Sequence, residues 1–135
     1  MIEEKIPLGL KEDGTPFRVL LADDSLFIAK QLGQILASEK FEVVATATNG
    51  VQAVESYKEV SPDLVTLDIT MPVMDGVTAL EQIMAYDKNA KVVMASALGK
   101  EDIVKKCIQT GAKSYILKPF DRAKVLERIV FVLTH

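Results

Sequence analysis

The sequence has very few of the residues that build disulfides, zinc clusters and export signals. Cys107 is the only cysteine among 135 residues, which excludes an intramolecular disulfide and a cysteine zinc site. No apolar run approaches the roughly 18 residues of a membrane helix, and no N-terminal segment has the form of a signal peptide. We therefore expect a protein of the reducing cytoplasm that is neither secreted nor membrane-spanning.

A surplus of positive charge is also absent. The formal net charge is −3, and no stretch interleaves basic with aromatic residues, so nucleic-acid binding is disfavoured. The charge is uneven, because residues 100–128 hold eight Lys or Arg against four Asp or Glu. This asymmetry gives weak support for an acidic partner, and solvated helix faces explain it equally well.

Length and composition fit one globular domain. Hydrophobic residues make up 49% of the chain and charged residues 26%, which is outside the range of disordered proteins. A chain of this length forms one hydrophobic core. Residues 1–16 show no sustained period, so we interpret them as an N-terminal extension, and we expect the domain to occupy residues 17–135 with no second domain after it.

Five short apolar runs alternate with helical patterns along the domain. They are too continuous for strands that have one solvated face, and they lie at residues 19–22, 43–45, 64–67, 92–95 and 115–117. Helical stripes separate them, and the last stripe follows a candidate N-cap, Asp121. This alternation predicts an α/β fold with a doubly wound, five-stranded parallel sheet covered by helices on both faces.

Polar side chains follow four of the five predicted strands. Asp23 and Asp24 come directly after the first run, and Asp68, Ser96 and Lys118 come after the third, fourth and fifth. Ligands of open parallel sheets bind outside the carboxyl ends of the strands, so we expect these groups in one crevice. Three adjacent carboxylates repel one another, and Mg²⁺, which prefers hard oxygen ligands, would relieve that repulsion.

A carboxylate in such a crevice is also a potential nucleophile. Asp68 would form an aspartyl-phosphate if a metal and fixed donors neutralised the phosphoryl oxygens. Lys118 and Ser96 would supply those donors. Each residue alone is more often a helix cap or a solvated charge, but their coincidence on one sheet edge favours the functional interpretation. Asp75, by contrast, is explained by a helix N-terminus.

The order of these residues resembles the receiver domain of two-component response regulators, in its stand-alone, CheY-like form. Four separate segments carry the resemblance: LLADDS at 20–25, DITMPVMDG at 68–76, SA at 96–97 and LKPF at 117–120. The resemblance implies a flavodoxin-like (βα)5 sheet with strand order 2-1-3-4-5. It also implies a signalling switch that is not an enzyme acting on metabolites and that catalyses only its own phosphorylation and dephosphorylation.

The resemblance assigns a role to each residue of the metal site. Asp68 would be the phosphoacceptor and a Mg²⁺ ligand. Asp24 would bind the ion directly, Asp23 through water, and Thr70 through its backbone carbonyl. Lys118 would precede a cis proline that aims the ammonium group inward.

The resemblance also implies how the signal leaves the site. Phosphorylation by a histidine kinase would draw Ser96 inward, and Tyr115 would follow. The surface of the fourth helix, fifth strand and last helix would then change its affinity for a downstream protein. The resemblance favours a role in chemotaxis, with the regulator as a monomer. Thr70 and Leu98 occupy the two positions that influence access of the hydrolytic water, so the lifetime of the phosphorylated form stays open.

Three other functions compete with this interpretation. A phosphorelay intermediate would pass phosphate between histidine-bearing proteins and would share the same residues. A Mg²⁺-dependent phosphohydrolase of the haloacid dehalogenase type carries a second Asp two residues after the nucleophile, where this chain has Thr70. A flavin or nucleotide binder needs a Gly-rich or hydroxyl-rich phosphate cradle after the first strand, where this chain has Asp23, Asp24 and Ser25.

Overall fold

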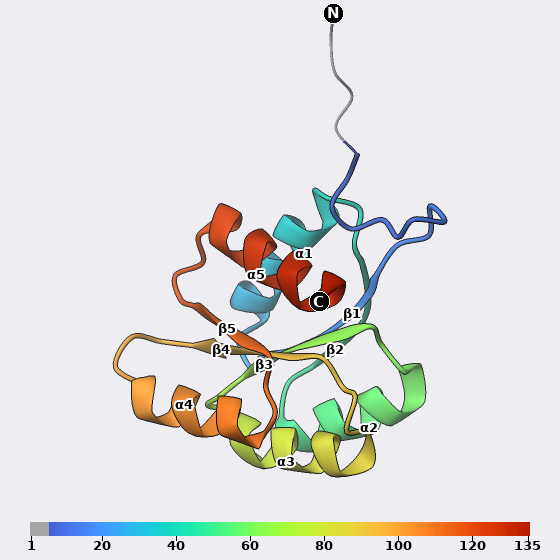
Figure 1. Ribbon diagram of the computed structural model, residues 1–135. Helices are drawn as coiled ribbons and strands as arrows, with labels where there is room; N and C mark the ends of the chain where they lie inside the picture. The colour runs from blue at the N-terminus through green and yellow to red at the C-terminus, as the bar shows by residue number, and fades with distance from the viewer. Residues whose placement is uncertain (1–5) are drawn as a thin grey trace, which may run out of the picture.

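The computed structural model describes residues 6–135, which form one parallel sheet with helices on both faces (Figure 1). Strands and helices alternate five times: β1 Arg18–Ala22, α1 Leu26–Ala37, β2 Glu42–Ala47, α2 Gly50–Val60, β3 Leu64–Asp68, α3 Gly76–Tyr86, β4 Val92–Ser96, α4 Glu101–Thr110, β5 Ser114–Leu117 and α5 Arg122–Thr134. The strand order is β2-β1-β3-β4-β5, with every pair parallel. The predicted fold is confirmed.

Alternating side chains of the strands fill two separate core layers. On one face, Val19 and Leu21 of β1 pack with apolar residues of α1 and α5. On the other face, Leu20 and Ala22 pack with residues of α2, α3 and α4. Figure 1 shows the two helical layers on opposite sides of the sheet. This period-two division follows from strand geometry, because successive side chains point to opposite faces.

The two edge strands differ from the sequence prediction. Every residue of β3 and β4 is buried, as the continuous apolar runs predict. Most residues of β2 and β5, however, are half-buried or exposed. Within the described residues each of these strands has a single neighbour, β1 or β4. The prediction that all five strands are buried on both faces is therefore wrong at the edges, where a layer of helix covers less of the strand.

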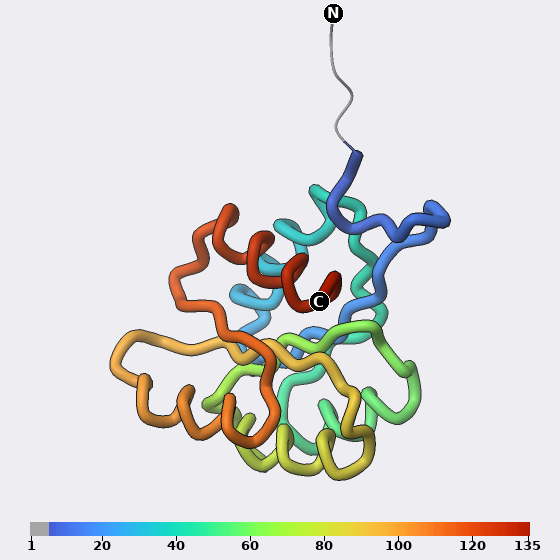
Figure 2. Tube along the Cα trace, in the orientation of Figure 1, coloured from blue at the N-terminus to red at the C-terminus, as the bar shows by residue number. Residues whose placement is uncertain are grey.

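Residues 6–16 of the predicted extension pack against the loop between α1 and β2, and residues 1–5 lie outside the described residues. Gly9 donates its N–H to the Glu39 carbonyl at 2.7 Å and accepts from the Phe17 N–H at 2.7 Å. A Cβ on Gly9 would collide with the backbone of Phe41, so the close approach requires glycine. Figure 2 shows this arm beside the end of α1. No described helix has the length and apolar character needed to cross a membrane.

Candidate functional site

Three carboxylates meet at the carboxyl ends of β1 and β3. Asp23, Asp24 and Asp68 each place one oxygen within 4.8 Å of the others. Asp23 and Asp68 are each only 6% exposed, whereas Asp24 faces solvent. The structure thus brings together the three acidic residues that the sequence predicts for the metal site.

The backbone around Asp68 fixes its position. Asp68 is the last residue of β3 and pairs with Ala95 of β4. Behind it, Gly76 donates its N–H to the Ile69 carbonyl at 2.8 Å. A Cβ at Gly76 would collide with the Asp68 carbonyl oxygen, so the loop can close against β3 only with glycine here. Asp75 caps α3 by accepting from the Thr78 N–H, which confirms its expected structural role.

Lys118 reaches into the acidic cluster from the end of β5. Its Nζ lies 2.9 Å from Asp23 Oδ2 and 3.3 Å from Asp68 Oδ1. The Lys118–Pro119 bond is cis, as the resemblance implied. Burial lowers the pKa of the Lys118 amine, but hydrogen bonds and charges of Asp23 and Asp68 outweigh burial and raise the pKa above its ordinary value. Lys118 therefore remains a charged ammonium group between the two carboxylates.

The Lys118 ammonium does not balance the negative charge of the three carboxylates, so a further cation is needed. Burial raises the pKa of Asp68 above its ordinary value, the negative charge of Asp23 raises it further, and Lys118 only partly opposes this. Three carboxylates and one ammonium group leave two negative charges, which a divalent ion would neutralise. Oxygen donors without nitrogen or sulfur are the ligand set that Mg²⁺ prefers. The residues therefore fit Mg²⁺ in both chemistry and charge.

Ser96 and Tyr115 lie in the neighbouring strands β4 and β5, and both face α4. Ser96 is 2% exposed at the end of β4, and its Oγ donates to the Ala97 carbonyl at 2.9 Å. Tyr115, in β5, is half-buried. Both residues line a cavity of ≈ 560 Å³ between α4 and β5. The two residues predicted to relay the signal therefore share one cavity wall.

Two further predicted residues lie in exposed loops around the cluster. Thr70 follows β3 with an exposed side chain, and Leu98 follows β4 with 72% of its surface exposed. The predicted role of the Thr70 carbonyl as a ligand stays a prediction. Neither side chain carries an acid or an amide that would hold a water molecule near Asp68.

The sequence analysis missed two features of this region. Val73, in the loop between β3 and α3, has a φ of +67° and is 83% exposed, an unusual conformation for a β-branched residue. Arg128 of α5 covers the Tyr115 ring, with 4.6 Å from its Cζ to the ring centroid. Val73 gave no signal in the sequence, because positions of positive φ usually carry Gly or Asn, and nothing in the sequence pattern places Arg128 near Tyr115.

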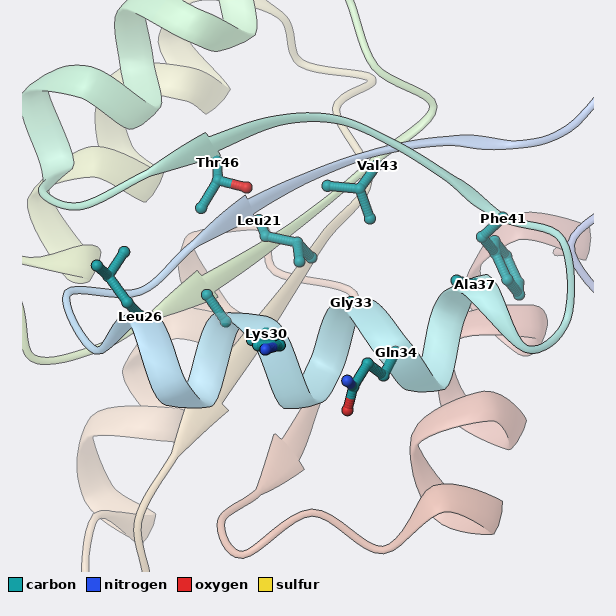
Figure 3. A pocket seen from close by; sticks show the side chains of 10 residues that line it. Leu21, Leu26, Lys30, Gly33, Gln34, Ala37, Phe41, Val43 and Thr46 are labelled. Atoms are coloured by element: carbon teal, nitrogen blue, oxygen red, sulfur yellow. The ribbon is translucent and has the colours of Figure 1, made fainter.

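A second cavity of ≈ 600 Å³ lies away from the chemistry, between α1 and β2 (Figure 3). In Figure 3, Leu21 and Val43 point from the sheet toward α1. Gly33 has no side chain to fill the space, and a Cβ there would meet only Leu21 Cδ1, at 3.8 Å. The lining is mostly apolar and includes none of the predicted site residues, so this groove adds nothing to the acidic site.

Comparison with known proteins gives consistent results. The profile of the response regulator receiver domain matches residues 19–130. The chemotaxis protein CheY of Treponema pallidum is 62% identical over 134 residues, covering 98% of this chain and 93% of that protein. The chemotaxis protein CheY of Bacillus subtilis is 54% identical over 112 residues, which is 83% of this chain and 93% of that protein.

A solved structure matches the whole fold. A chain in the crystal structure of the CheX–CheY–BeF3–Mg²⁺ complex from Borrelia burgdorferi superposes with a TM-score of 0.92. It is 55% identical, and the match covers 95% of this chain and 98% of that chain. The similarity therefore extends over strands, helices and the loops that hold the acidic cluster.

Proposed function

Because this chain belongs to the response regulator receiver family and is a signalling switch of the chemotaxis type, we propose that Asp68 is its phosphoacceptor and that the reaction requires Mg²⁺. The observation that carries the proposal is the convergence of Asp23, Asp24 and Asp68 around the Lys118 ammonium. A buried carboxylate with a raised pKa gains stability when a cation binds beside it.

The residues divide the chemistry among them. Asp24 and Asp68 would hold Mg²⁺ directly, Asp23 through water and Thr70 through its carbonyl oxygen. When bound, the ion would neutralise the negative charge on the phosphoryl oxygens. An Asp68 Oδ atom attacks phosphorus, the new O–P bond forms, and the P–N bond of a phosphohistidine breaks as imidazole leaves. Lys118 and Ser96 then hold phosphoryl oxygens by charge and by hydrogen bond.

Receivers of this type are phosphoacceptors rather than enzymes that act on metabolites. We infer that this chain promotes only its own phosphorylation and dephosphorylation. Neither of the exposed side chains of Thr70 and Leu98 carries an acid or an amide that would orient a water for attack. A partner that supplies such a group is therefore expected to accelerate the dephosphorylation that the chain promotes by itself.

The output surface is the face formed by α4, β5 and α5. Ser96 must abandon its bond to the Ala97 carbonyl in order to donate to a phosphoryl oxygen. Tyr115 can follow into the adjoining cavity. The cavity is lined by Lys100 and Lys105 against one acid, Glu101, and this net positive charge favours an acidic downstream protein.

The input surface surrounds the acidic cluster. Exposed apolar side chains lie in the loops or helix starts that follow β1, β3 and β4, namely Leu26, Phe27, Val73 and Leu98. Such a rim suits the docking of a histidine kinase, which must bring its phosphohistidine to Asp68. By its 55% identity to the Borrelia chain, we infer that this protein also binds a CheX-like partner. We place it in the cytoplasm, as a monomer.

A phosphorylation assay tests the proposal. The protein is incubated with a small phosphodonor, with Mg²⁺ or with EDTA, and its intact mass is recorded. The expected result is the gain of one phosphoryl group only with Mg²⁺, and its loss in Asp68→Asn. Asp75→Asn, which alters a helix cap, is the control and should still be labelled. Labelling that survives Asp68→Asn would refute the assignment.

A further inference from the structure

Arg128 and Tyr115 form a cation–π pair. The Arg128 Cζ lies 4.6 Å from the centroid of the Tyr115 ring, inside the roughly 6 Å over which such attraction acts. Both side chains are half-buried, so water only partly screens the guanidinium. The ring of Tyr115 therefore has a specific partner in the structure seen here, in addition to its apolar contacts.

This pair crosses the free edge of the sheet. Tyr115 packs against the core layer shared with α2, α3 and α4. Arg128 belongs to α5, which packs on the opposite face through residues such as Val125 and Ile129. Among the described strands β5 has β4 as its only neighbour, so the arginine reaches around an unpaired edge. A residue of α5, which packs on one face of the sheet, thus contacts the side chain of Tyr115, which packs on the other face.

The Tyr115 ring has room to leave this partner. Ser96, Val104 and Tyr115 line the ≈ 560 Å³ cavity between α4 and β5. A ring that moved toward Ser96 would increase its distance from the guanidinium, because Arg128 is attached to α5 on the far side of the sheet edge. The movement expected on phosphorylation therefore breaks the cation–π pair.

We propose that Arg128 is a positioning residue that holds Tyr115 in the unphosphorylated arrangement and so opposes the switch. The proposal rests on the proposed function, since a phosphoryl group on Asp68 supplies the opposing force. By linkage, a group that stabilises the unphosphorylated arrangement weakens binding of any ligand that prefers the other arrangement. Loss of a cation–π pair of this exposure shifts that equilibrium about two- to fivefold.

Charge alone predicts the opposite result, which makes the proposal testable. Arg128 lines a pocket together with Lys118, whose ammonium contacts Asp68. Removing a nearby cation weakens the binding of an anion at Asp68 by ordinary electrostatics. If a variant that lacks the Arg128 guanidinium binds the anion more tightly, the cause is therefore the release of Tyr115. The loss of positive charge near Asp68 would have the opposite effect.

The test measures binding of beryllofluoride, a phosphoryl mimic, in the presence of Mg²⁺. The variants are Arg128→Gln and Arg128→Lys, with Lys124→Gln as the matched control, because Lys124 lies on the same helix and lines the same pocket as Arg128. Each is also made in a Tyr115→Ala background. Ring signals of Tyr115 are followed by NMR, and Tyr115→Phe assigns them among the three tyrosines.

We expect Arg128→Gln to bind beryllofluoride about two- to fivefold more tightly, with Tyr115 signals already shifted before it is added. Arg128→Lys should give a smaller gain, and carries the test if Arg128→Gln fails to fold. Lys124→Gln should bind equally or more weakly. In the Tyr115→Ala background the gain should disappear.

Equal or weaker binding by both Arg128 variants, or the same gain without Tyr115, would overturn the inference while leaving the proposed function intact. If the unmodified protein binds no beryllofluoride in the presence of Mg²⁺, the proposed function fails, and the inference that rests on it fails too.

Discussion

Asp68 is held in an environment that disfavours its own charge. Burial and the charge of Asp23 both raise its pKa, and the Lys118 ammonium compensates only in part. If position 68 served the fold alone, an uncharged asparagine would be more stable there than an aspartate. The structure thus keeps an electrostatic cost at the residue where the chemistry is proposed, as active sites commonly do.

Replacing Asp68 by Asn should therefore stabilise the protein when Mg²⁺ is absent. The raised pKa means that the stability which protonated Asp68 contributes at pH values below the ordinary carboxyl pKa is lost as pH rises through the raised value. We expect Asp68→Asn to melt a few degrees higher at neutral pH in EDTA, for a gain on the order of 1 kcal/mol. The gap should close as pH falls toward the ordinary carboxyl value of 3.8. Thermal melts across this range are the measurement, and a variant that is less stable throughout would contradict the electrostatic argument.

Lys118→Met should have the reverse effect. It leaves Asp23 and Asp68 without the ammonium at 2.9 and 3.3 Å, so the free energy of unfolding in EDTA should fall by about 1–3 kcal/mol. Mg²⁺ should restore much of this loss, because it supplies the missing positive charge. Denaturant unfolding with and without Mg²⁺ measures both effects. The control is Lys124→Met, on the exposed surface of α5, which should change neither the stability nor its dependence on Mg²⁺. An equal loss of stability in both variants would show that charge pairing is not the cause.

Elements of the fold were predictable where the pattern is strong and local. The apolar runs locate all five strands, and Asp121 caps α5 as expected, accepting from the Ala123 and Lys124 N–H groups. The apolar pattern alone did not show which strands lie at the edges; the strand order implied by the resemblance did, but it did not show that β2 and β5, each with a single neighbour, are only partly buried. The contact between Arg128 and Tyr115 was not predicted either, because it joins two elements that meet only in the folded protein, around the edge of the sheet.

Two glycines on helices should respond to alanine in opposite directions. Gly33 faces the open groove between α1 and β2, so Gly33→Ala should stabilise the protein by about 0.5–1 kcal/mol through helix propensity. Gly76 begins α3 against the Asp68 carbonyl, so Gly76→Ala should cost more than about 2 kcal/mol and impair phosphorylation. Chemical denaturation of both variants tests the contrast, and similar values for the two would contradict the packing described.

At the scale of the whole molecule, the arm and the acidic site lie at opposite ends of the sheet. Residues 6–16 contact the loop before β2 and the start of β1, whereas Asp68 lies where β3 ends. The sequence identified the site from four strand ends but left the arm as an extension, because its contacts with Glu39 and Asp63 are made across the fold and have no local signature.

Deleting residues 1–15 should therefore separate stability from function. The loss of the Gly9 hydrogen bonds and the uncovering of Phe41 should lower the free energy of unfolding by about 2–4 kcal/mol. Beryllofluoride affinity at a temperature where the protein stays folded should be unchanged. A truncated protein of unaltered stability, or one that loses affinity while folded, would contradict this division.

The most direct test of the central claim is to locate the phosphoryl group on the chain. After reaction with a small phosphodonor and Mg²⁺, borohydride reduces an acyl phosphate to an alcohol, and peptide mapping identifies the altered residue. We predict a single reduced residue, Asp68, which disappears when EDTA replaces Mg²⁺. Reduction at Asp23, Asp24 or any other carboxylate, or at Asp68 without Mg²⁺, would contradict the account.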